Sequence, residues 1–364
     1  MSRVLIIGPL PPAVGGIATI MGTLRQEFAP AKDISFINSS KPESLAGRVL
    51  RPIVLAGKIL MKSFDLRGGR VLIFSSAYWS FWEKCFWIFL CRLGGAHVVL
   101  EMVDGNFPRF YSTLSPASRR LSAYFMRHVE ILAAQSERWQ MYYRDIFPKA
   151  NIRVVSAGID TDFFVPPVKK RENDPVRVVY IGWLLKEKGI EDLVNAARIL
   201  DGMAVQFQLR LIGPILPDDR NRIMGRINEF GICSKVKIID PITSRDLILR
   251  EYQSADIFAF PSHFEGFPFA LLEAISSGLP CVGTVVGGIP DILDEGDCGI
   301  LVEKESPEEL AEALRRLIYA PELRTELGKR ARIRAENEYA LAKSFESYRR
   351  LLYIEREGKE RLWH

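Results

Sequence analysis

The chain of 364 residues is longer than one typical domain and fits two. Its 48% hydrophobic and 26% charged residues are ordinary for a globular protein. The five cysteines form no Cys-x-x-Cys pair, which favours reduced thiols over a disulfide framework or a zinc site. No apolar run reaches about 18 residues, so we expect no membrane-spanning helix. The N-terminus indicates a first strand and no cleavable signal.

Charge is distributed unevenly along the chain. Residues 1–168 carry 20 Lys and Arg against 12 Asp and Glu, whereas the remainder carries 29 against 32. This basic first half suggests an anionic partner.

Strand and helix patterns alternate through the first half, which predicts a parallel sheet with crossover helices. The expected strands are Arg3–Ile7, Ile34–Asn38, Val71–Ser75, His97–Met102, Glu130–Ala134 and Arg153–Ser156. The expected helices lie near 17–28, 44–63, 80–93, 115–128 and 137–147. Ligands of such sheets bind beyond the strand C-termini.

The loop after the first expected strand contains Gly15 and Gly16. It lacks the Gly-x-Gly-x-x-Gly fingerprint, which disfavours a dinucleotide site. The pair either brings backbone amides to a ligand or forms a plain turn that starts a helix.

Residues 45–63 and 78–93 combine apolar bulk with scattered cations. Basic amphipathic helices can lie in a membrane interface, with Trp at the boundary and Lys or Arg towards anionic lipid. The alternative is that both segments are crossover helices whose apolar faces cover the sheet. We favour a core role for 78–93 and leave 45–63 open.

Aspartates and prolines mark the end of the first half. Asp160 and Asp162 form an Asp-x-Asp pair, which elsewhere can hold a divalent metal, but turn-making aspartates are favoured here. Residues 166–175 are polar and Pro-rich, as expected of a linker.

The second half repeats the alternation, which predicts a second parallel sheet. Its expected strands are Arg177–Ile181, Gln208–Ile212, Val236–Ile239, Ile257–Phe260, Cys281–Thr284 and Gly299–Val302, and three helices follow near 306–318, 321–337 and 341–356.

The most informative stretch of the chain is 256–291. It predicts a buried strand, a turn, and a helix that opens near Pro268 and aims free amides at an anion such as a diphosphate. Gly266 permits a close backbone approach. Glu265 lies on the loop, and Glu273 is expected about two turns down the helix.

The Glu265-x7-Glu273 pair stands within Pro-Ser-x-x-Glu-Gly-Phe-Pro, and Gly-Gly-Ile-Pro-Asp follows it. This pattern resembles the signature of the family 4 glycosyltransferases, which are retaining, nucleotide-sugar-dependent enzymes of the GT-B fold. The resemblance implies two Rossmann-like parallel-sheet domains that face each other across a cleft. It implies an acceptor-binding domain at 1–166, a nucleotide-sugar-binding domain at 175–340, and a C-terminal helix at 341–364 that crosses back to the first domain.

The resemblance also assigns site residues. Glu273 would accept hydrogen bonds from the ribose, Glu265 would face the sugar, and Lys188 would hold the diphosphate. The implied catalytic residues are Glu265, Asp104 and Lys188. The implied nucleotide-sugar contacts are Gly15, Gly16, Gly182, Trp183, Lys186, Lys188, Gly213, Gly266, Phe267, Pro268 and Glu273. No metal is implied.

The chain departs from the family pattern at three places. Trp183 replaces the usual Arg, so that either Lys186 supplies the lost charge or Trp183 stacks on a base or sugar. Only Gly213 remains of a Gly-x-Gly turn, and no histidine follows the fourth strand, where Asp104 is the nearest polar candidate. His263 is a further candidate because it stands two residues before Glu265.

The resemblance therefore implies a metal-independent retaining glycosyltransferase without a cofactor. It would move a sugar from a UDP- or GDP-linked donor to a glycan or lipid-linked acceptor in cell-surface polysaccharide or glycolipid synthesis. The alternative is a sugar-nucleotide-binding partner subunit with little catalysis of its own. We expect a cytoplasmic protein that binds no nucleic acid, with an anionic membrane surface as a candidate partner of the basic first domain.

Overall fold

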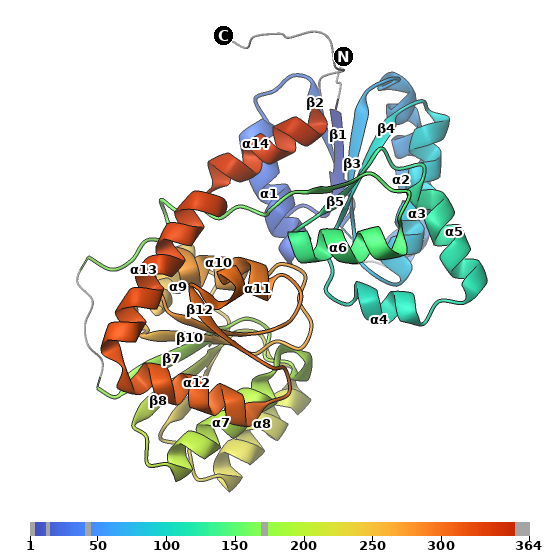
Figure 1. Ribbon diagram of the computed structural model, residues 1–364. Coiled ribbons are helices and arrows are strands. Elements are labelled where there is room, and N and C mark those ends of the chain that lie inside the picture. Colours follow the sequence, from blue (N-terminus) through green and yellow to red (C-terminus); the bar gives the residue numbers. More distant parts are fainter. Residues whose placement is uncertain (1–3, 12–14, 41–44, 169–173, 354–364) are drawn as a thin grey trace. The chain divides into compact units, whose positions relative to one another are not determined.

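The computed structural model describes residues 4–11, 15–40, 45–168 and 174–353. The chain divides into two compact units: residues 1–157 with 342–364, and residues 158–341. Each unit contains one six-stranded parallel sheet with helices on its faces, which confirms the predicted α/β class (Figure 1).

The first unit is built on a sheet in the order β2-β1-β3-β4-β5-β6. Its strands are β1 (Val4–Gly8), β2 (Ile34–Asn38), β3 (Arg70–Ser75), β4 (His97–Met102), β5 (Ile131–Ala134) and β6 (Ile152–Val154). Its helices are α1 (Gly16–Phe28), α2 (Leu45–Asp65), α3 (Trp79–Leu93), α4 (Phe107–Ser112), α5 (Pro116–Met126), α6 (Glu137–Ile146) and α14 (Leu341–Leu352). The central strands are almost wholly apolar and buried, as expected of a sheet covered on both faces.

Strand order determines which helices share a face. The chain moves from β1 to β2 in one direction and then from β2 through β6 in the other. Since such crossovers are right-handed, α1 covers one face, and α2, α3, α5 and α6 cover the other. Core side chains of α2, α3 and α6, among them Ile59, Phe81 and Trp139, form one cluster on this second face.

Helix α14 packs on the first unit, which confirms the predicted return of the C-terminal helix. Tyr348 donates a hydrogen bond of 2.8 Å to Glu101 Oε2 in β4, and the Leu352 carbonyl accepts one of 3.2 Å from Arg70. The rings of Phe345 and Phe28 of α1 meet edge to face.

The second unit is built on a sheet in the order β12-β11-β10-β7-β8-β9. Its strands are β7 (Val176–Ile181), β8 (Phe207–Ile212), β9 (Val236–Ile239), β10 (Ile257–Phe260), β11 (Cys281–Thr284) and β12 (Gly299–Val302). Its helices are η1 (Lys186–Lys188), α7 (Ile190–Gly202), α8 (Pro217–Glu229), α9 (Arg245–Ser254), α10 (Phe269–Ser276), α11 (Ile289–Ile292), η2 (Asp294–Gly296), α12 (Pro307–Tyr319) and α13 (Pro321–Glu338).

Two local predictions were wrong. Helix α4 was not expected, although Pro108 in its first turn and Asp104 before it are start signals. Helix α10 begins at Phe269, so Glu273 lies about one turn into it, not two. Pro268 precedes the helix as its N-cap because its backbone is extended.

A close backbone contact joins two loops at the C-terminal edge of the second sheet. Gly189 follows η1 with a φ of +69°, and a Cβ on it would lie 1.8 Å from the Pro261 carbonyl oxygen. Only glycine combines this φ with this approach. The contact places η1, which follows β7, against the loop that follows β10.

We predict that Gly189→Ala destabilises the second unit by more than about 1 kcal/mol, because the new methyl group meets both a strained φ and a backbone oxygen. The matched control is Gly225→Ala within α8, where a Cβ has no neighbour within 4 Å among the described residues. This control should keep or raise stability, since alanine is the better helix former. Thermal unfolding of both variants tests the prediction, and equal melting temperatures would contradict it.

A second prediction concerns Glu101, whose side chain is completely buried. Burial raises the pKa of Glu101 to about 8, although the hydrogen bond from Tyr348 lowers it. The folded chain then holds a proton that the unfolded chain releases near pH 4.5, so this group's contribution to stability falls as the pH rises from about 4.5 to 8. One pKa unit corresponds to about 1.4 kcal/mol.

Glu101→Gln cannot ionise, and we expect it to lose less thermal stability than the wild type between pH 6 and pH 9. Glu137→Gln, which removes an exposed carboxylate of α6, should follow the wild type. Equal losses in Glu101→Gln and the wild type would refute the assignment of this proton.

Candidate functional site

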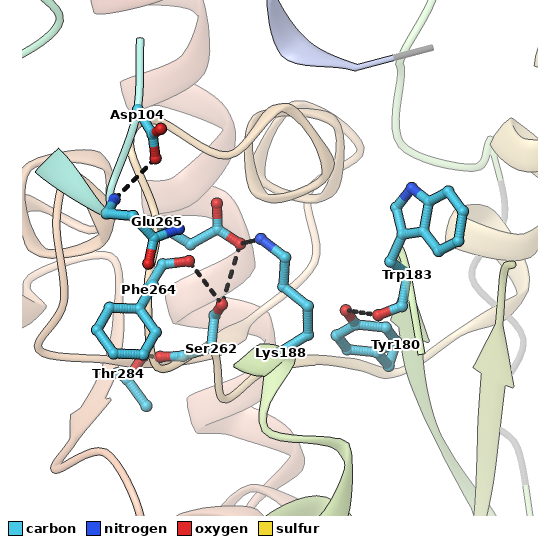
Figure 2. Close-up of polar contacts among 9 residues, drawn as sticks. Asp104, Tyr180, Trp183, Lys188, Ser262, Phe264, Glu265 and Thr284 are labelled. Atoms are coloured by element: carbon cyan, nitrogen blue, oxygen red, sulfur yellow. Dashed lines mark hydrogen bonds and ion pairs between the residues drawn. The ribbon is translucent and has the colours of Figure 1, made fainter. Parts of the chain in front are cut away.

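The centre of the candidate site is an ion pair between Lys188 of η1 and Glu265 of the loop after β10 (Figure 2). Lys188 Nζ lies 2.5 Å from Glu265 Oε1, and the Ser262 hydroxyl donates a hydrogen bond of 3.0 Å to the same oxygen. The two side chains are 28% and 11% exposed. Solvent screens the attraction within such a pair less than it screens that of a surface pair.

Backbone contacts hold the loop that carries Glu265. The Thr284 hydroxyl at the end of β11 donates a hydrogen bond of 2.6 Å to the Ser262 carbonyl. The Gly288 amide donates one of 2.9 Å to the Gly266 carbonyl. A Cβ on Gly287, whose φ is +54°, would lie 1.9 Å from the Glu265 carbonyl oxygen. These contacts restrict the loop before any ligand binds, which lowers the ordering cost of binding.

His263 is buried, and its side chain contacts α7. Its Nε2 lies 2.5 Å from Asp192 Oδ2, and its backbone amide donates a hydrogen bond of 2.9 Å to the Glu187 carbonyl. The histidine therefore joins the loop to both η1 and α7.

The N-terminus of α10 follows the loop directly. Among the described residues no side chain caps this helix, which leaves its first-turn amides available to an anion. The ring of Phe267 is buried against Tyr339, with 5.6 Å between the ring centroids. The Phe267 side chain thus packs in the interior, and only its backbone can take the predicted nucleotide-sugar contact.

Glu273 is held by Tyr252 of α9. The Tyr252 hydroxyl lies 2.9 Å from Glu273 Oε2 and 3.1 Å from the Ala270 carbonyl oxygen. Burial raises the pKa of Glu273 to about 7, against the opposing effects of the Tyr252 hydrogen bond and of Arg245. The single hydroxyl proton of Tyr252 can be donated either to Glu273 or to the Ala270 carbonyl.

Close packing explains one of the predicted glycines, Gly213. A Cβ on Gly213 would lie 2.0 Å from the Gly182 carbonyl oxygen, so the ends of β7 and β8 approach too closely for a side chain. The Tyr180 hydroxyl donates 2.9 Å to the Trp183 carbonyl (Figure 2). The Trp183 side chain is 43% exposed, and Lys186 is exposed on η1. Among the described residues, neither side chain makes a contact that assigns it the role of the usual arginine.

The predicted residues of the first unit lie at the C-terminal edge of its own sheet. Gly15 is the N-cap of α1, where a Cβ would meet no described atom within 4 Å, and Gly16 is the first helical residue. Asp104 Oδ2 accepts a hydrogen bond of 2.8 Å from the Ala77 amide, and its Oδ1 accepts one of 2.8 Å from the Asn106 amide. Both oxygens of Asp104 thus accept hydrogen bonds from backbone amides.

The Asp-x-Asp segment forms a turn. Asp160 Oδ1 accepts a hydrogen bond of 3.0 Å from the Phe163 amide, and its Oδ2 lies 3.2 Å from Arg245 Nη2. Among the residues that the structure describes, no group of three or more His, Cys, Asp or Glu could hold a metal ion.

Sequence reasoning missed the partners that hold the site. Tyr252 stands 21 residues before Glu273, outside every motif, and Thr284 stands 19 residues after Glu265, between the two quoted patterns. Only the sheet order brings them close. Ser262 was visible within the quoted pattern, but its contact with Glu265 was not.

The family to which the chain can be compared matches its second half. Residues 162–334 match the family described as glycosyl transferases group 1. D-inositol 3-phosphate glycosyltransferase of Corynebacterium aurimucosum is 32% identical over 54% of this chain and 50% of its own. The capsular polysaccharide biosynthesis glycosyltransferase CapM of Staphylococcus aureus is 28% identical over 51% of this chain and 49% of its own. The chain thus spans about half the length of the curated relatives that it matches.

Solved structures extend the likeness to the whole fold. Sucrose-phosphate synthase of Thermosynechococcus elongatus has a TM-score of 0.79 at 20% identity, over 97% of this chain and 100% of its own. Anabaena HepE, solved in complex with UDP, has a TM-score of 0.78 at 14% identity over the same shares. The likeness to these two structures over nearly the whole chain confirms the predicted fold class. Residues 162–334 are thus similar to the glycosyl transferases group 1, and this is the part of the chain that carries the resemblance.

Proposed function

We propose that the chain is a retaining glycosyltransferase that transfers a sugar from a nucleotide-diphosphate donor to a glycan or lipid-linked acceptor. The observation that carries the proposal is the Lys188–Glu265 pair beside the uncapped N-terminus of α10, with Glu273 one turn further on. This arrangement combines a cation and free amides with two carboxylates. The cation and the free amides suit a diphosphate, and the two carboxylates suit the hydroxyls of a ribose and a sugar.

The names of the similar proteins fit this class of reaction. HepE was solved with UDP and glucose and with UDP-glucose, and CapM belongs to capsular polysaccharide biosynthesis. We therefore propose a UDP- or GDP-linked donor and a role in cell-surface polysaccharide or glycolipid synthesis.

Cleavage of the sugar–diphosphate bond adds negative charge to the leaving group and positive charge to the sugar ring. We propose that Lys188 and the first-turn amides of α10 stabilise the diphosphate without a metal ion, because they are fixed by the loop contacts. Glu265 would face the positive sugar ring. The acceptor hydroxyl would attack from the side of the leaving group and pass its proton to a diphosphate oxygen, which retains the configuration.

The other predicted residues keep smaller roles in this proposal. Gly15 and Gly16 would bring backbone amides to the diphosphate or acceptor, and Trp183, being exposed, would stack on a base or sugar. Lys186 would add positive charge near the phosphates. A catalytic role for Asp104 stays a prediction.

We predict that Glu265→Gln and Lys188→Ala each lower the transfer rate by about a hundredfold or more, since each removes a charge aimed at the transition state. Lys237→Ala, which removes an exposed lysine of β9, is the matched control and should transfer at the wild-type rate. The measurement is product formation with the donor that raises the melting temperature most in a screen of UDP- and GDP-sugars. Undiminished turnover in both site variants would refute the assignment. Donor binding by the wild type without transfer would favour the partner-subunit alternative.

The pKa of Glu273, raised by burial to about 7, predicts a pH dependence of donor binding. Ribose hydroxyls need an acceptor, and the carboxylate form of Glu273 predominates only above that pKa. The affinity for the donor should therefore rise between pH 6 and pH 8. Glu273→Gln should bind more weakly and with a flatter pH profile.

Calorimetric titration with an intact nucleotide sugar checks this prediction, because its diphosphate diester does not change charge in this range. Tighter binding at pH 6 than at pH 8 would contradict it.

A further inference from the structure

The outer surface of α2, α3 and α5 in the first unit carries a set of exposed large hydrophobic side chains. We call it the outer helix face, and it consists of Ile53, Val54, Met61 and Phe64 of α2, Trp79, Phe86, Phe89 and Leu93 of α3, and Leu121 and Tyr124 of α5. These ten make up nearly half of the exposed large hydrophobics in the described part of the chain. An apolar concentration of this kind marks an interaction surface.

Helix α3 is apolar on two opposite sides. Phe81, Cys85 and Ile88 are buried in the core. Trp79, Phe86 and Leu93 recur every seven residues on the other side, where Trp79 is 77% exposed. The core role expected for 78–93 explains only half of this helix.

Helix α2 lies directly beside α3 and extends the same surface. A Cβ on Gly94, just after α3, would lie 2.5 Å from Ser63 Cβ of α2. Ile53, Met61 and Phe64 share one exposed side of α2 by helical spacing, and Met61 is 71% exposed. Helix α5 packs on α3 from its other flank and adds Leu121 and Tyr124.

The same elements carry a strong excess of cations. Helices α2, α3 and α5 contain eight Lys and Arg against two acids, and these acids are paired with lysines, Asp65 with Lys62 and Glu83 with Lys84. Between Asp104 and Glu130 the chain has four arginines and no acid. Exposed cations of this region include Lys58, Lys62, Arg92, Arg120 and Arg127.

We propose that the outer helix face binds the surface of a membrane that contains anionic lipids. Apolar side chains with a Trp can enter the interface, while the flanking Lys and Arg meet lipid phosphates. A second copy of this face is a poorer partner, because two strongly basic surfaces repel each other. None of the helices among the described residues is long and apolar enough to span a bilayer, so the helices would lie on the surface. This proposal concerns the first unit and does not depend on the proposed reaction.

Flotation of the purified chain with vesicles tests the proposal. We expect flotation with phosphatidylcholine–phosphatidylglycerol vesicles, a loss of flotation in high salt, and little with phosphatidylcholine alone. Phe86→Glu/Phe89→Glu and Lys58→Glu/Lys62→Glu should each weaken the partitioning about tenfold or more, since each basic residue near an anionic surface contributes about a fivefold factor.

Two matched controls make the same changes in the second unit. Tyr319→Glu/Ile333→Glu replaces two exposed hydrophobics, and Lys237→Glu/Lys329→Glu reverses two exposed lysines. Both should float like the wild type. Melting temperatures of all variants check folding, and the lysine variant tests the proposal even where the phenylalanine variant unfolds.

Three results would overturn the proposal. The wild type does not float with anionic vesicles, it floats equally well with neutral vesicles in high salt, or the controls lose as much binding as the outer-face variants. A dimer in solution that Phe86→Glu/Phe89→Glu dissociates, without any flotation, would instead assign the face to a second copy of the chain.

Discussion

The site depends on one interaction between opposite charges that lie far apart in the sequence. Lys188 ends a short helix after β7, and Glu265 stands on the loop after β10. Both side chains are largely shielded, and Ser262 and the backbone of Gly189 and Gly287 restrict the loops that carry them. A cation and a carboxylate held in this way supply a fixed field, which costs no reorganisation when charge develops on a substrate.

The topology of the second sheet explains why these groups meet. Strands β11, β10, β7 and β8 are neighbours and run parallel, so the loops after them share one edge. Helix α10 begins at the same edge and directs its first amides there, while Tyr252 of α9 supports Glu273 from behind. The groups proposed to hold the donor through Lys188, Glu265, Glu273 and α10 therefore all lie in this unit, and the family match covers the same part of the chain.

Much of the fold could be predicted from the sequence, because apolar strand runs and their turn residues are local signals. Strands such as Ile257–Phe260 and Cys281–Thr284 have the expected bounds. The start of α10 could not be predicted to the residue, since Pro268 fits either the first turn or the N-cap. The burial of Phe267 against Tyr339 and the contact of Asp104 with the Ala77 amide depend on distant partners, and no local pattern shows them.

The most direct test of the account is a structure of the chain with an intact nucleotide sugar bound. We predict a diphosphate oxygen within hydrogen-bond distance of Lys188 Nζ and of the first-turn amides of α10, with the ribose hydroxyls on Glu273. A donor bound elsewhere, with Lys188 still held only by Glu265 and Glu273 held only by Tyr252, would contradict it.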